Sequence, residues 1–388
     1  MLQIKLFTND IKWAVFLCCL IYSSLLKSQT IKGNLSLLAN KTIGLEGFNG
    51  LNSYPISSCN VDEKGNFKLS YAKSDYGVGY LIAEDKKPLF VILSGEDIEI
   101  VGDALSAVET IRILKGQENM WFEQYAKEHP KREQALSAWI YLEQIYVADS
   151  LFIIQKTPSK AIQLEKQRIT KEDNEFLVKL PANSYVSWFL PKRKLVSSVS
   201  TVAQYRPKEI PSAISAFRAL DYTDSRLYKS GLFRDAIESH FWLLENSGKS
   251  LDSVFIEMKL SIDAMMVHLI KDEKKLNEVT DYLFDLLERH SLFQASEYLA
   301  LKALNETSCT LNSDLAKQLE TYRAMKKGNI APEILFIDNV IAPGFKDKKI
   351  PKKLRDLNSK YKLVVFGASW CPKCKEELPE IAKQYQKW

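Results

Sequence analysis

The composition of this 388-residue chain already limits its class. Apolar residues make up 46% of the sequence, which is enough for packed cores in roughly two or three domains. The formal net charge is only +5, and no basic run with interleaved aromatic residues occurs. The sequence therefore argues against a nucleic acid as partner.

Residues 1–28 are typical of a secretory signal peptide. Lysines precede a short apolar run, Trp13–Tyr22, and small residues follow it at Ser23, Ser24 and Ser28. The run is too short to predict a membrane span, although an N-terminal anchor, or lipid attachment at Cys18 or Cys19, stays open. We therefore expect an exported protein of the periplasm or cell envelope, where disulfides form and persist.

Residues 29–104 are predicted to form an antiparallel β-sandwich. Asn66–Tyr71 and Asp97–Ile100 alternate polar and apolar residues, as half-buried strands do. Turn signals at Glu63–Asn66 and Ser94–Asp97 precede these strands. Several short strands at this spacing favour a small two-sheet domain.

Residues 105–327 are predicted to be all-helical. Apolar residues recur at spacings of three and four in Ser250–Lys271, and the pattern continues in Asp272–Arg289 and Ser291–Glu306. The histidines lie far apart without metal-ligand spacing, so no metal or other cofactor is expected. Prolines are expected to mark helix boundaries: Pro130, Pro158, Pro181, Pro191, Pro207 and Pro211.

A pair of cysteines near the end of the chain is the candidate reactive site of the protein. The apolar run Leu363–Phe366, a predicted strand, is followed by Cys371 and Cys374 at the start of a predicted helix. A helix start stabilises a thiolate through its unpaired N–H groups and its dipole. We therefore predict that Cys371 attacks a disulfide and that Cys374 resolves the mixed disulfide.

The neighbours of the pair are predicted to modulate it. Pro372 has a backbone geometry suited to a helix start, Lys373 adds a positive charge, and Trp370 precedes the motif. A zinc half-site or two buried thiols are the alternatives, but a four-cysteine site needs a second close pair. Cys59 and Cys309 are far apart in sequence, and whether they pair with each other stays open.

These residues resemble a known family. Val364–Pro379 is similar to the active-site segment of thioredoxin-fold proteins of the TlpA/ResA type, the periplasmic thiol-disulfide oxidoreductases. Gly328–Ile334 resembles the G-x-x-A-P-x-F entry segment that this group shares with peroxiredoxins, whose Pro-x-x-x-Thr-x-x-Cys signature is replaced here. The layout of residues 29–104 resembles the β-domain of unknown function that often precedes TlpA-like domains.

The resemblance implies an exported thiol-disulfide oxidoreductase that exchanges disulfides with envelope proteins and is reset by a redox partner protein. The dipeptide between the cysteines is Pro-Lys where thioredoxin has Gly-Pro, so the direction of electron flow stays open. Fourteen residues follow Cys374, whereas the family places further strands and a cis-proline loop there. Residues 328–388 are therefore expected to form an incomplete thioredoxin-like α/β domain. The alternative is a non-enzymatic periplasmic binding module with a vestigial tail.

Overall fold

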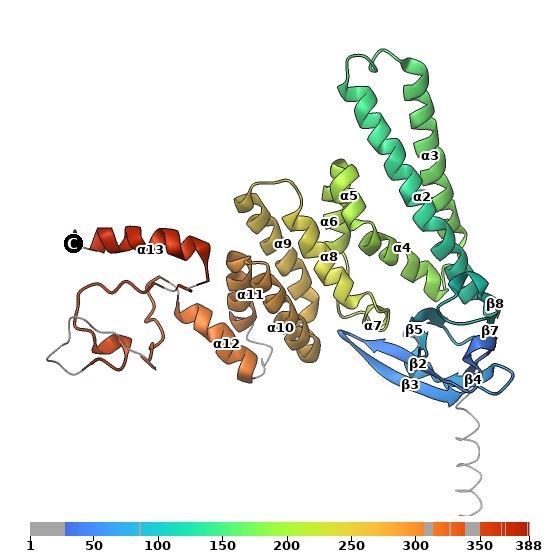
Figure 1. Ribbon diagram of the computed structural model, residues 1–388, viewed down its shortest axis with the longest axis horizontal. Helices are drawn as coiled ribbons and strands as arrows, with labels where there is room; N and C mark the ends of the chain where they lie inside the picture. The colour runs from blue at the N-terminus through green and yellow to red at the C-terminus, as the bar shows by residue number, and fades with distance from the viewer. Residues whose placement is uncertain are drawn as a thin grey trace, which may run out of the picture. The chain divides into compact units, whose positions relative to one another are not determined.

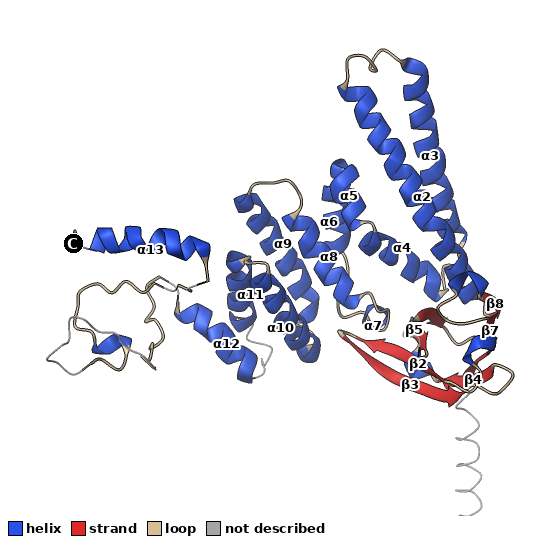
Figure 2. Ribbon diagram, viewed as in Figure 1, coloured by secondary structure: helices blue, strands red, loops and turns tan. Residues whose placement is uncertain are grey.

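The computed structural model describes residues 28–84, 87–305, 313–325, 327–337, 350–365, 367–368, 370–385 and 387 (Figures 1 and 2). The chain divides into two compact units between Glu320 and Thr321. In the first unit, sheets precede helices, so the predicted order of a β region and a helical region is confirmed. The predicted leader lies outside the described residues except for Ser28.

The described strands form two four-stranded sheets. The first has the order β4-β1-β7-β8, with bounds Asn66–Tyr71, Gln29–Leu35, Ile98–Gly102 and Arg112–Lys115. The second has the order β3-β2-β5-β6, with bounds Asn52–Asn60, Thr42–Asn49, Gly77–Ile82 and Leu89–Leu93. The strands continue to Lys115, beyond the boundary predicted at residue 104.

One pairing differs from the predicted antiparallel arrangement. Strands β1 and β7 run parallel, with Ile31 opposite Ile98, whereas the other pairs are antiparallel. A parallel pair requires a long crossover connection, and the chain supplies one by building the whole second sheet between β1 and β7. This pairing links distant segments, so local alternation did not predict it.

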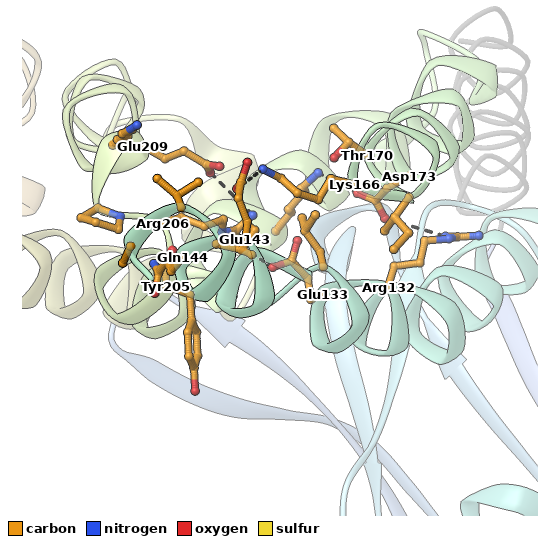
Figure 3. A pocket seen from close by; sticks show the side chains of 18 residues that line it. Arg132, Glu133, Glu143, Gln144, Lys166, Thr170, Asp173, Tyr205, Arg206 and Glu209 are labelled. Atoms are coloured by element: carbon orange, nitrogen blue, oxygen red, sulfur yellow. Dashed lines mark hydrogen bonds and ion pairs between the residues drawn. The ribbon is translucent and has the colours of Figure 1, made fainter. Parts of the chain in front are cut away.

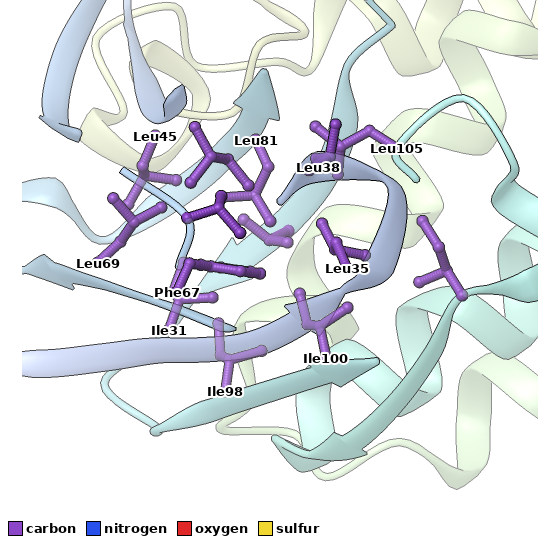
Figure 4. Packing of buried hydrophobic residues seen from close by; sticks show 14 of the residues in the cluster. Ile31, Leu35, Leu38, Leu45, Phe67, Leu69, Leu81, Ile98, Ile100 and Leu105 are labelled. Atoms are coloured by element: carbon purple, nitrogen blue, oxygen red, sulfur yellow. The ribbon is translucent and has the colours of Figure 1, made fainter. Parts of the chain in front are cut away.

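Both sheets contribute to one hydrophobic core (Figure 4). Phe67 and Leu69 of β4 point into it, whereas the intervening Lys68 is exposed. The strands pack closely enough to require glycine at position 33, where a Cβ would lie 2.6 Å from the carbonyl oxygen of Ile100. The period-two pattern therefore predicted the buried face of β4 correctly.

The helical part begins at Gln117 rather than at residue 105. Its α-helices are α2 (Gln117–Ala148), α3 (Lys156–Lys179), α4 (Tyr185–Ser197), α5 (Val199–Tyr205), α6 (Ile210–Arg218), α7 (Ser225–Tyr228), α8 (Phe233–Glu245), α9 (Leu251–Leu269), α10 (Glu273–Arg289) and α11 (Phe293–Asn305), and α12 (Ser313–Ala324) follows. The three helices predicted between residues 250 and 306 are confirmed as α9, α10 and α11. Helices α2 and α3 form a long antiparallel hairpin (Figure 1).

The prediction that every proline marks a helix boundary is wrong at two positions. Pro130 lies inside α2, and Pro191 lies inside α4. An interior proline costs about 3 kcal/mol through a lost hydrogen bond and a steric clash. In α2 the packing of buried side chains such as Tyr125 and Leu136 along the hairpin offsets that cost.

The sheets and the helices are joined by buried hydrogen bonds. The side-chain amide of Asn119, on α2, donates to the Ile92 carbonyl at 2.8 Å and accepts from the Ile92 N–H at 2.7 Å. The Val78 N–H donates to the Lys229 carbonyl at 2.8 Å. The β region and the helical region, predicted as separate domains, therefore belong to one compact unit.

The second unit, Thr321–Trp388, contains little regular structure among its described residues. An isolated bridge joins Leu335 to Lys353, and helix α13 spans Pro372–Tyr385. The strand predicted at Leu363–Phe366 is not formed over Leu363–Val365, and Phe366 lies outside the described residues. A strand needs a hydrogen-bonded neighbour, and the described part of the unit places none beside this segment. The thioredoxin-like domain therefore stays a prediction.

Candidate redox site

Helix α13 positions the two cysteines. Cys371 immediately precedes Pro372, the first residue of the helix, as the sequence predicted. The Cys371 N–H donates to the Ala368 carbonyl at 3.1 Å, and its own carbonyl accepts the Lys375 N–H at 3.3 Å. Cys371 thus lies at the point where a tight turn becomes a helix, and Cys374 lies one turn further on.

The environment of the Cys371 sulfur favours the thiolate. The pKa of Cys371 is lowered below its ordinary value, and the largest cause is a hydrogen bond with the neighbouring Cys374 thiol. The Cys374 backbone N–H adds to this effect by donating to the Cys371 sulfur at 3.4 Å, and the Lys373 N–H acts in the same direction. Amide donors at a helix start stabilise an anion, so more of the nucleophilic form exists near neutral pH.

The two sulfurs have different surroundings. The amide donors gather on Cys371, whereas Cys374 lies against the backbone of Gly367. A Cβ at Gly367 would lie 3.9 Å from the Cys374 sulfur and 3.5 Å from Leu378. This asymmetry favours Cys371 as the attacking thiol and Cys374 as the resolving one.

Two of the three predicted modulating residues, Lys373 and Trp370, differ in what they contact. The Lys373 ammonium is 3.3 Å from Glu376 and 3.9 Å from Glu377, and its side chain is 73% exposed. Its charge is therefore shared with carboxylates and screened by water, and its backbone N–H is the group that acts on Cys371. Trp370 is 82% exposed, so it is free to contact a substrate.

The remaining sequence predictions about cysteines and metals are tested only in part. Cys59 is a free thiol on β3, and Cys309 lies outside the described residues, so their pairing stays open. No group of three or more histidine, cysteine or acidic side chains that could hold a metal occurs in the described ranges. None of the helices described there is long and apolar enough to cross a bilayer.

The chain was compared with known proteins. No protein-family model, curated protein or solved structure matches it. The likeness to TlpA/ResA-type proteins therefore depends on the residues of the motif alone.

The lowered pKa of Cys371 predicts selective alkylation. Limiting iodoacetamide below neutral pH should label Cys371 before Cys374, because only the thiolate reacts. Peptide mapping by mass spectrometry measures the ratio, with Cys59 as an internal reference. Preferential labelling of Cys374 would reverse the assigned roles.

Sequence reasoning missed a second site-like feature, a pocket of about 690 Å³ in the first unit (Figure 3). It lies between α2, α3 and the segment Tyr205–Glu209, and several of its charged side chains are paired between these elements. Arg206 donates to Glu133 at 2.8 Å, and Lys166 pairs with Glu143. These pairs join the hairpin helices to each other and to the segment after α5.

At one end of this pocket Asp173 is buried among basic groups. Its carboxylate is 2.6 Å from the Lys194 ammonium, 2.8 Å from Nδ1 of His129 and 3.7 Å from Arg132. Burial by itself would raise the pKa of Asp173, but the hydrogen bonds from His129 and Lys194 outweigh it and lower the pKa to about 2. A sequence signal existed, because Asp173 follows Ile169 by four residues on the apolar face of α3.

Proposed function

We propose that this protein exchanges disulfides with protein thiols of the cell envelope through Cys371 and Cys374. The observation that carries the proposal is the Cys371 sulfur at the start of α13, which accepts the Cys374 N–H and has a second thiol within hydrogen-bonding reach. A nucleophilic thiolate with a resolving thiol one helical turn away is the minimum machinery for this reaction.

The reaction has two steps. The Cys371 thiolate attacks one sulfur of a substrate disulfide, forming a mixed disulfide, and the other substrate sulfur leaves as a thiolate and takes a proton. Cys374 then loses its proton and attacks the Cys371 sulfur, which releases the second substrate thiol. Two electrons pass to the substrate, and the pair becomes a disulfide. The reverse sequence oxidises a substrate dithiol.

Export and the family likeness complete the proposal. The apolar segment at Trp13–Tyr22 supports delivery to an oxidising compartment, where the pair needs a redox partner to reset it. The similarity of Val364–Pro379 to TlpA/ResA-type active sites supports the same reaction class. Exposed Trp370 is suited to contacting a protein substrate next to the attacking sulfur.

A glutathione titration of the full chain tests this function. We expect a single two-electron transition in which Cys371 and Cys374 form an intramolecular disulfide, detected as two thiols protected together from alkylation. Cys371→Ser should remove the transition, and Cys59→Ser should leave it unchanged. Formation of stable glutathione adducts without an internal disulfide would contradict the proposal.

A further inference from the structure

The connection between α2 and α3 exposes four consecutive apolar side chains. It lies at the end of the long hairpin (Figure 1), and we call residues Asp149–Gln155 the hairpin tip. Leu151 is 72% exposed, Phe152 37%, Ile153 58% and Ile154 71%. Single exposed apolar residues are common, but a contiguous group at a projecting turn indicates an interaction surface.

Most backbone N–H groups of the tip have hydrogen-bond acceptors within the turn, which lowers the free energy needed to remove the tip from water. Asp149 organises it, because its carboxylate accepts the Leu151 N–H at 2.8 Å and its carbonyl accepts the N–H groups of Phe152 and Ile153 at 3.1 and 3.0 Å. The Gln155 N–H donates to the Phe152 carbonyl at 2.8 Å. Most of the amide donors of the turn are therefore already bonded, which removes the largest penalty for entering an apolar medium.

Lysines outnumber acids in and beside the tip. Lys156 and Lys160 are exposed just after it, and neither forms an ion pair within the part of the chain that the structure describes. Asp149 accepts a hydrogen bond from the neutral Leu151 N–H and keeps its negative charge, so the two lysines leave the tip with an excess of one positive charge. The next lysine along α3, Lys166, is paired with Glu143. An apolar turn followed by two lysines is complementary to a bilayer surface that carries anionic lipids.

We propose that the hairpin tip inserts into the interface of a bilayer containing anionic lipids. Leu151, Ile153 and Ile154 enter the boundary between headgroups and acyl chains, and Lys156 and Lys160 contact the lipid phosphates. The projecting shape and the satisfied backbone favour a soft bilayer over a protein groove, which would have to match the turn in detail. This contact is independent of the cysteine pair and would hold the protein at the membrane surface.

Vesicle binding by the full chain tests the proposal. We expect sedimentation with vesicles of phosphatidylcholine and phosphatidylglycerol, and weaker binding to phosphatidylcholine alone or at high salt. The double variant Ile153→Ser with Ile154→Ser should bind about tenfold more weakly. The matched control replaces Ile256 and Leu260 of α9, which are 60% and 51% exposed, by serine and should bind like the parent chain.

A depth measurement separates the tip from the apolar segment at residues 13–22. Tryptophan placed by Leu151→Trp should be quenched by brominated acyl chains, whereas Leu260→Trp on α9 should not. Parent-like sedimentation of the Ile153/Ile154 serine variant, or no additional quenching with Leu151→Trp, would overturn membrane insertion and leave the tip as a protein contact surface.

Discussion

Asp173→Asn is expected to destabilise the first unit by about 3–5 kcal/mol at pH 7. Asp173 is 4% exposed and its carboxylate lies among Lys194, His129 and Arg132, so its neutral replacement leaves basic groups without a buried counter-charge. Urea unfolding monitored by circular dichroism measures the loss. The matched control is Glu172→Gln, the adjacent acid of α3, whose pair with Arg168 is exposed and should contribute less than about 1 kcal/mol.

The free energy of unfolding is also expected to depend on pH differently in the parent chain and in Asp173→Asn. The pKa of Asp173 is lowered to about 2 in the folded chain, whereas an unfolded aspartate titrates near about 3.9. The ionised carboxylate therefore contributes fully to the free energy of unfolding above about pH 4. As the pH falls toward 2, about 2 kcal/mol of this contribution is lost. The Asn variant lacks this dependence. Equal loss of stability in the parent and in Asp173→Asn between pH 5 and 2.5 would show that the carboxylate is not held ionised by its neighbours.

The elements that local pattern predicted correctly are those whose own residues carry enough information. Helices α9, α10 and α11 are long and have apolar residues at regular helical spacing. Strand β4 alternates along its full length. In each case the residue pattern of the segment indicates which face is buried, so the element could be identified without knowledge of distant contacts.

The features that were missed or wrong depend on distant residues. The parallel pairing of β1 with β7 joins segments separated by a whole sheet, and the interior position of Pro130 depends on the packing of α2 against α3. Leu363–Val365 reads as a strand because it is apolar, but strand formation requires a partner that the described residues of its unit do not provide.

The candidate sites follow the same rule. The motif placed Cys371 and Cys374 at a helix start because helix-start geometry is local, and the structure agrees. The ion pairs of Lys373 with the following glutamates, which weaken its predicted effect, require side-chain geometry. Asp173 lies on α3 but its partners come from α2 and α4, so an acid at an apolar position was the one local clue.

Cys371→Ser is expected to abolish disulfide exchange. A serine hydroxyl is not ionised near neutral pH and forms no disulfide, so reduction of insulin by the pre-reduced chain in a single turnover should slow by at least about 100-fold. The rate is read from the release of insulin thiols under anaerobic conditions. Cys59→Ser is the matched control because it removes a thiol from β3 and leaves the pair intact.

Trapping with Cys374→Ser tests most directly whether Cys371 attacks and Cys374 resolves. This variant keeps the nucleophile and removes the resolving thiol, so the first step should proceed and the second should stop. Intact-mass analysis after mixing with insulin should show a covalent mixed disulfide, and peptide mapping should place it on Cys371. Full turnover by Cys374→Ser, or a stable adduct on Cys374 in the Cys371→Ser variant, would contradict this mechanism.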